Sequence, residues 1–225
     1  GVADRIREAY GYLSEHYESG DHVYLFGFSR GAFEARSLAG FVDAVGLLLA
    51  DQARGPDRRR LTDIAYELYR RGDAESLAFL RRFLRRVTGR AAPQAGAETR
   101  RLAPVDLHLV GVWDTVGAIG FGDWNDRVPM LRAHTTHHVV DRLPACIRHG
   151  RHALALHELR HKFEPRPWLG AAAGQDIQQC WFAGAHADVG GGYPDAESHL
   201  ADIALRWMAD ETAALSARTA CPLRF

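Results

Sequence analysis

Short runs of apolar residues alternate along the chain with stretches of helical periodicity. In residues 2–17 apolar side chains recur at spacings of three and four, which predicts an amphipathic helix ending at Ser19-Gly20-Asp21. Residues 22–28 form a nearly continuous apolar run, typical of a parallel strand covered on both faces. A second helical pattern covers residues 32–49. Ser29 therefore lies between a predicted buried strand and a predicted helix.

Two later apolar runs also end in polar side chains. Residues 105–113 precede Asp114, and residues 180–183 precede Gly184-Ala185-His186. Residues 142–158 predict a helix between these runs, and residues 200–217 predict a closing helix. This alternation of strand and helix favours an α/β fold with a parallel sheet flanked by helices. The length of 225 residues predicts one domain over residues 1–225.

The segment 51–101 differs from the rest of the chain in charge. It holds 13 Arg against 7 Asp and Glu, an excess of six positive charges. Two amphipathic helices are predicted in it, over residues 61–69 and 77–87, followed by a connection over residues 91–99. The segment therefore predicts a helical insertion after the helix of residues 32–49. One hypothesis is that this insertion caps a functional site and contacts anionic lipid at a membrane surface. The alternative is an ordinary solvated helical face.

Composition excludes several classes of protein. Lys plus Arg and Asp plus Glu number 28 each, so no global charge predicts a nucleic-acid partner. Three widely separated cysteines predict neither a disulfide framework nor a thiolate zinc site. No apolar stretch approaches membrane-spanning length, and no signal peptide opens the chain, so we expect a soluble protein. Arg outnumbers Lys 27 to one, which suggests a GC-rich bacterial gene.

The residues around Ser29 match the G-x-S-x-G pattern, in which a strand turns sharply into a helix and presents a serine nucleophile. Gly27 and Gly31 flank the serine at two positions on either side. We expect both to be glycine because side chains there would collide across so tight a turn. The backbone N–H of Arg30, directly after the nucleophile, is the first expected donor of an oxyanion hole.

A serine nucleophile requires a general base and a carboxylate that orients the base. Asp114 and His186 follow Ser29 in the order nucleophile, acid, base, and each follows a predicted strand. Carboxyl ends of parallel strands share one edge of a sheet, so we expect the three side chains to meet there. The structural alternatives are a helix cap for Asp114 and a buried structural histidine for His186. Asp188 is the rival acid, or a support for the histidine loop before Gly190-Gly191-Gly192.

Histidine-rich stretches raise a metal alternative. His134, His137 and His138 cluster, and residues 157–161 read H-E-x-x-H, a zinc-binding pattern when both histidines share one helix face. Against it, no third ligand is evident, Trp168 and nearby prolines end any helix soon after, and Arg160 and Lys162 would place positive charge beside the cation. We therefore predict no metal, and the proposed triad requires no organic cofactor.

Three segments together carry a family resemblance: Tyr24 to Ala32, Val112 to Gly117, and Trp181 to Tyr193. The chain resembles an uncharacterised α/β-hydrolase domain family that includes phospholipase effectors of bacterial type VI secretion. Residues 153–160 also look like a family block, although the position of His157 is usually an aspartate there. The resemblance implies a triad of Ser29, Asp114 and His186 and hydrolysis of an ester, often of a phospholipid.

The resemblance also implies a lipid or other ester substrate and a partner in the secretion apparatus. Members typically begin with a strand bearing Asp-Gly-Thr upstream of the helix that opens this chain. We therefore expect N-terminal strands, and with them the second oxyanion donor, to lie outside these residues. A truncated or degenerate domain serving as a non-catalytic interaction or delivery module is the alternative function. The expected location is cytoplasmic, or exported without a cleaved signal.

Overall fold

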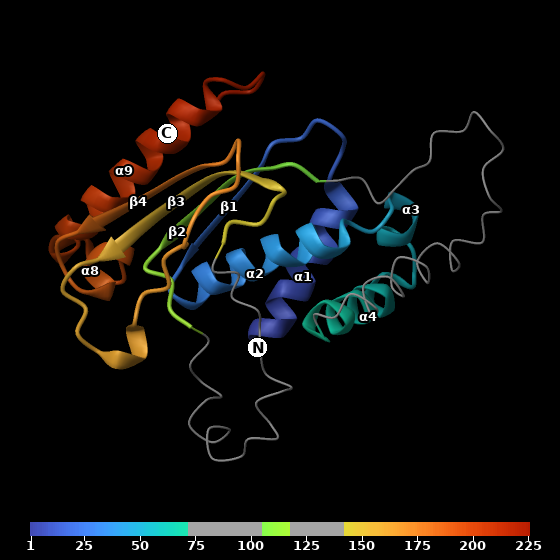
Figure 1. Ribbon diagram of the computed structural model, residues 1–225, viewed down its shortest axis with the longest axis horizontal. Helices are drawn as coiled ribbons and strands as arrows, with labels where there is room; N and C mark the ends of the chain where they lie inside the picture. Colours follow the sequence, from blue (N-terminus) through green and yellow to red (C-terminus); the bar gives the residue numbers. More distant parts are fainter. Residues whose placement is uncertain (72–104, 118–141) are drawn as a thin grey trace, which may run out of the picture.

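The computed structural model describes residues 1–71, 105–117 and 142–225, which form a parallel β-sheet flanked by helices (Figure 1). Its strands are β1 (Val23–Phe28), β2 (Leu107–Trp113), β3 (Ile147–Ala155) and β4 (Asp176–Phe182). They lie side by side in the order β1-β2-β3-β4, and each neighbouring pair is parallel. The four carboxyl ends therefore meet at one edge of the sheet, as expected for an α/β fold.

Helices cover the two faces of the sheet unequally. One face carries α1 (Val2–His16), α2 (Arg30–Val45), the short α3 (Ala50–Ala53) and α4 (Arg58–Arg71). The other face carries α8 (His186–Gly190) and α9 (His199–Ser216), which pack on β3. The 3-10 turns η1 (His161–Phe163) and η2 (Asp195–Glu197) lie in the connections before β4 and α9. The helices predicted over residues 2–17, 61–69 and 200–217 are confirmed, whereas the one predicted over residues 32–49 ends at Val45. Residues 77–87 lie outside the described residues.

An aromatic cluster joins α1, α2 and α4. Phe41 of α2 is fully buried, and its ring stacks on Tyr10 of α1 at 4.1 Å and on Tyr69 of α4 at 5.1 Å between ring centroids. The Tyr10 hydroxyl donates to the Gly46 carbonyl at 2.9 Å. Burying a ring of this size contributes about 2–3 kcal/mol. The cluster fixes α2, the helix that begins directly after Ser29.

On the opposite face, a buried arginine pairs with two partly exposed carboxylates. The Arg151 side chain on β3 is 2% exposed and contacts Glu211 of α9 at 2.7 Å and Asp176 of β4 at 2.6 Å. These pairs satisfy a guanidinium that would be costly to bury alone. On this face the Phe26 side chain of β1 is 44% exposed. The expectation that β1 is covered on both faces is therefore wrong at Phe26.

The helix predicted over residues 142–158 is wrong, because most of that segment forms β3. Its Ala, Leu and Arg residues favour helix, but tertiary contacts override such preferences. β3 pairs with both β2 and β4, and the polar Arg151 and His152 on it are almost fully buried. Their main side-chain and backbone partners, Asp176, Glu211 and the Thr115 N–H, come from other elements. The local periodicity of the sequence therefore did not indicate the strand.

No helix within residues 1–71, 105–117 and 142–225 combines the length and apolar character that crossing a membrane requires.

Candidate active site

Ser29 occupies the sharp turn between β1 and α2. Its backbone has φ 58° and ψ −118°, in the left-handed half of φ space that non-glycine residues rarely adopt. Such a conformation costs about 1–3 kcal/mol and persists where neighbouring contacts hold it. Here the Ser29 N–H donates to the Trp113 carbonyl at the end of β2, at 3.0 Å. The strand-turn-helix context expected for G-x-S-x-G is confirmed.

The two glycines of this motif differ in the space around them. A Cβ on Gly27 would lie 2.3 Å from the Gly31 carbonyl oxygen, so no side chain fits at position 27. A Cβ on Gly31 would meet no described atom within 4 Å. Gly31 is also the second residue of α2 and has no positive φ. The expectation that both glycines are required for space is therefore wrong for Gly31.

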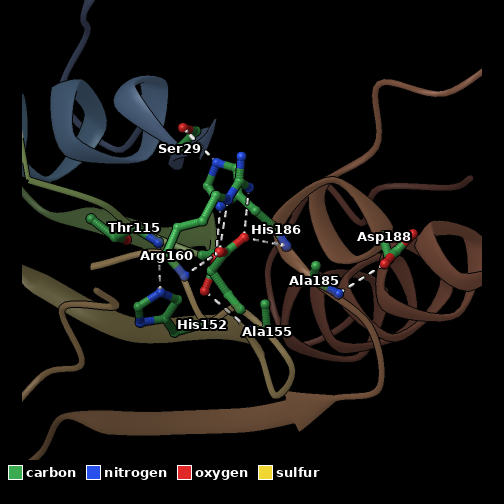
Figure 2. A network of polar contacts seen from close by, with 10 residues as sticks. Ser29, Thr115, His152, Ala155, Arg160, Ala185, His186 and Asp188 are labelled. Atoms are coloured by element: carbon green, nitrogen blue, oxygen red, sulfur yellow. Dashed lines mark hydrogen bonds and ion pairs between the residues drawn. The ribbon is translucent and has the colours of Figure 1, made fainter. Parts of the chain in front are cut away.

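His186 connects the serine to a carboxylate. Its Nε2 lies 2.7 Å from Ser29 Oγ, and its Nδ1 lies 2.7 Å from Asp114 Oδ2. His186 is 5% exposed and Asp114 is fully buried. Figure 2 shows Ser29 and His186 pointing toward one another at the edge of the sheet. The three side chains that the sequence placed after predicted strands therefore form one hydrogen-bonded series.

The Asp114 carboxylate is held from two sides. Its Oδ1 accepts the Ala155 N–H at 3.0 Å while Oδ2 faces His186, and its own N–H donates to the Ala153 carbonyl at 2.7 Å. Its φ of 38° turns the chain away from the end of β2. These contacts anchor the carboxylate between β2 and β3, with one oxygen directed at the imidazole.

Asp188, the rival acid, has a different partner. Its Oδ2 accepts the Ala185 N–H at 2.8 Å, which caps the start of α8 (Figure 2). Gly184 precedes this cap with φ 112°, and a Cβ there would lie 2.4 Å from the Asp188 Cβ. Asp188 therefore supports the loop that carries His186, and the imidazole contacts Asp114 instead.

Two phenylalanine rings flank the imidazole. The centroid of Phe28 lies 4.6 Å and that of Phe163 lies 4.7 Å from the His186 ring. Gly190 allows this packing, because a Cβ there would lie 2.0 Å from the Phe28 ring. Sequence analysis missed Phe163, which lies in a 3-10 turn without a periodic signal. The rings limit how far the imidazole can move.

His152 of β3 binds the backbone of Thr115, the residue that follows Asp114. Its Nε2 accepts the Thr115 N–H at 3.1 Å, so that nitrogen carries no proton. Burial lowers the pKa of His152 from an ordinary value of 6.5 to about 3, and the charge of Arg36 adds to the shift. His152 therefore stays neutral at physiological pH.

The zinc alternative for residues 157–161 is wrong because these residues do not form a helix. His157 lies in the turn after β3, and His161 begins the 3-10 turn η1. The Nδ1 of His157 accepts the Gly184 N–H at 3.0 Å, and Glu158 pairs with Arg160. In the part of the chain that the structure describes, no three His, Cys, Asp or Glu side chains gather as a metal site would require. His134, His137 and His138 lie outside the described residues.

The fold and the site define an α/β protein in which a serine, a histidine and an aspartate are hydrogen-bonded in series at the carboxyl edge of a parallel sheet. Residues 1–211 match the family described as "T6SS, Phospholipase effector Tle1-like, catalytic domain", and the chain belongs to this family. The resemblance drawn from the three sequence segments is thus confirmed at the level of the family.

One curated relative is the uncharacterized protein YEL023C of Saccharomyces cerevisiae, 30% identical over 177 residues. The match covers 74% of this chain and 22% of the yeast protein, so the chain spans about a fifth of that relative. A relative in yeast means that the similarity extends beyond bacteria. No solved structure matches the chain.

Proposed function

We propose that the chain is a serine-dependent carboxylic-ester hydrolase of the α/β-hydrolase type, acting on lipid esters such as phospholipids. We propose further that residues 1–225 form one catalytic domain. The observation that carries the proposal is the series from Ser29 Oγ through both nitrogens of His186 to Asp114 Oδ2, with both contacts at 2.7 Å. Membership in a family of phospholipase effectors supports the lipid substrate.

In the acylation step, Ser29 is the nucleophile and His186 the general base. Neutral His186 carries its proton on Nδ1, and this N–H donates a hydrogen bond to Asp114 Oδ2. Its Nε2 accepts a hydrogen bond from the Ser29 hydroxyl. Oγ bonds to the ester carbonyl carbon as its proton moves to Nε2, and the carbonyl electron pair moves onto oxygen. Asp114 stabilises the resulting imidazolium. When the tetrahedral intermediate collapses, the bond to the alcohol oxygen breaks and the alcohol takes the Nε2 proton.

Deacylation repeats these steps with water. The water oxygen bonds to the acyl carbon and gives a proton to Nε2. The bond to Ser29 Oγ then breaks, and Oγ recovers a proton from Nε2 as the carboxylic acid leaves. No redox step or external cofactor enters the cycle.

The oxyanion of both intermediates requires preorganised donors, and Arg30 supplies the first one. Arg30 is the first residue of α2, where N–H groups have no carbonyl partner within the helix. The N-terminal end of the helix dipole also favours negative charge at this point. We assign no second donor among the described residues.

For the whole protein, we propose a secretion-system context, since the matched family is named after a type VI secretion phospholipase effector. The cation-rich segment 51–101, whose described part includes α4, would favour binding to anionic lipid head groups. Binding to vesicles that depends on anionic lipid and weakens with added salt would support this role.

Hydrolysis of phospholipid vesicles by the parent protein and by Ser29→Ala tests the proposal. Free fatty acid is measured over time, with Ser19→Ala, an exposed serine in the turn after α1, as the matched control. We expect release by the parent and by Ser19→Ala, and a loss of at least about 10³-fold in Ser29→Ala. Unchanged release of fatty acid by Ser29→Ala contradicts the mechanism. If the parent releases no acid from any ester, a non-catalytic module is favoured instead.

A further inference from the structure

The loop that carries His186 is held by three side chains acting on three consecutive backbone N–H groups. Gly184 N–H donates to His157 Nδ1 at 3.0 Å, and His186 N–H donates to Glu158 Oε2 at 3.3 Å. Between them, Ala185 N–H donates to Asp188 Oδ2 at 2.8 Å. Every amide of the segment that delivers the imidazole thus has a side-chain acceptor.

Two of these acceptors are neighbours in the turn after β3. The N–H of Leu156 donates to the Phe182 carbonyl and that of His157 to the Gly184 carbonyl, each at 3.0 Å. These bonds continue the β3–β4 pairing beyond the ends of both strands. Residue 157 therefore bonds residue 184 twice, once through its backbone and once through its imidazole. The turn and the histidine loop are tied together at this point.

Glu158 occupies a more buried position than its neighbours. Its side chain is 3% exposed, whereas that of Arg160 is 59% exposed. Besides the His186 amide, the carboxylate accepts the backbone N–H of Arg160 at 2.8 Å and two bonds from its guanidinium, at 2.8 and 2.6 Å. The guanidinium bonds are the main cause that lowers the pKa of Glu158 to about 2. The carboxylate is therefore ionised at every pH at which a histidine base works.

Arg160 links Glu158 to the imidazole ring through Phe163. Its guanidinium lies over the Phe163 ring, 3.9 Å from the centroid, in a cation–π arrangement. Phe163 in turn packs against His186. Glu158 thus acts on His186 by two routes, directly on its backbone N–H and indirectly through Arg160 and the ring that flanks the imidazole.

We propose that His157 and Glu158 are positioning residues for the general base, a role that rests on the proposed hydrolase function. Neither contacts the reacting atoms. They fix the position and orientation of the His186 imidazole relative to Ser29 and Asp114. Displacements of about 1 Å in such a base lower turnover by roughly 10²-fold. This role accounts for the H-E pair that sequence analysis considered as part of a zinc motif.

The role predicts a loss in kcat with KM unchanged, because proton transfer is impaired while the substrate surface stays intact. At positions 157 and 158, activity should depend on whether the new side chain can accept a hydrogen bond. Asn offers an oxygen near the place of Nδ1, so His157→Asn should keep most activity that His157→Leu loses. Likewise Glu158→Gln keeps an oxygen acceptor, and should retain more activity than Glu158→Leu.

The test measures kcat and KM for an ester with the parent and these four variants, and melting temperature for each. Glu164→Leu, which changes an exposed carboxylate later in the same connection, is the matched control. We expect kcat to fall about 10- to 100-fold in both Leu variants, recovery in His157→Asn and partial recovery in Glu158→Gln, and parent-like values in the control. Because His157 is exposed, its Leu variant carries the test even where Glu158→Leu fails to fold.

Folded Leu variants with kcat within about twofold of an active parent overturn the positioning role and leave the proposed hydrolase intact. Equal losses in His157→Leu and His157→Asn overturn it as well, since the acceptor would then be irrelevant. An inactive parent instead overturns the proposed function.

Discussion

Ser29 and Asp114 terminate two adjacent parallel strands, and both have positive φ angles, of 58° and 38°. Each residue turns the chain where its strand ends, and both side chains reach His186. Two non-glycine residues in this conformation at one sheet edge store backbone strain where the chemistry is proposed. A direct bond from Ser29 N–H to the carbonyl of Trp113, which precedes Asp114, keeps the two turns in register.

Replacing Asp114 or Asp188 by Asn distinguishes the two candidate acids. In Asp114→Asn one oxygen can still accept the Ala155 N–H, but an amide NH₂ then faces His186 Nδ1 and favours the wrong tautomer. We expect kcat to fall by roughly 10³–10⁴-fold. Asp188→Asn keeps an oxygen acceptor for the Ala185 N–H, so kcat should stay within several-fold of the parent. Steady-state kinetics on a soluble ester make the comparison, and a larger loss in Asp188→Asn would reverse the assignment.

The two glycines of the motif should respond oppositely to alanine. Gly27→Ala places a methyl group 2.3 Å from the Gly31 carbonyl oxygen, and we expect it to lower the free energy of unfolding by about 1–3 kcal/mol or more. In Gly31→Ala the methyl group meets no described atom within 4 Å and replaces a helical glycine, which stabilises by up to about 1 kcal/mol. Urea unfolding of both variants measures the difference. A destabilised Gly31→Ala would contradict the open space described here.

His152 should make the fold sensitive to acid. Its pKa is about 3 in the folded chain against an ordinary 6.5, so below pH 6.5 the unfolded state binds a proton that the folded state excludes. The free energy of unfolding therefore falls as the pH drops from 6.5 toward 3, by about 2 kcal/mol at pH 5 from this residue. His152→Gln removes the titration and keeps an acceptor for the Thr115 N–H.

Urea unfolding at pH 7 and pH 5 compares this variant with the parent. We expect a smaller loss of stability at pH 5 in His152→Gln. Other groups with lowered pKa values, Glu158 and Asp176 among them, titrate equally in both proteins and cancel in the comparison. Identical losses in the two proteins would mean that His152 does not carry the effect.

Strong local signals made much of the fold and the site predictable. The apolar run of β1 is continuous, and that of β2 is interrupted by His108. Both runs lead directly into polar residues with a chemical role in the proposal, Ser29 and Asp114. Parallel strands share one carboxyl edge, so these strand ends and the one before His186 predicted a common site. The contacts at 2.7 Å agree with that prediction.

Features that depend on distant partners could not be read from the sequence. β3 contains Arg151 and His152, whose burial is compensated by Asp176, Glu211 and the Thr115 N–H, all from other elements. His157 and Glu158 matched part of a zinc-binding pattern in the sequence. Their role as hydrogen-bond acceptors for the histidine loop depends on the pairing of β3 with β4, which the sequence does not show. The space around Gly31 depends likewise on how α2 leaves the turn.

The central claim is that Ser29 is a nucleophile activated by His186. A fluorophosphonate probe forms a covalent bond with the oxygen of an activated serine and loses fluoride, so labelling followed by peptide mass spectrometry tests the claim most directly. We predict one adduct, on Ser29, abolished in Ser29→Ala, strongly slowed in His186→Ala and unaffected in Ser19→Ala. Absence of labelling in a folded parent protein, or equal labelling of Ser29→Ala, would contradict it.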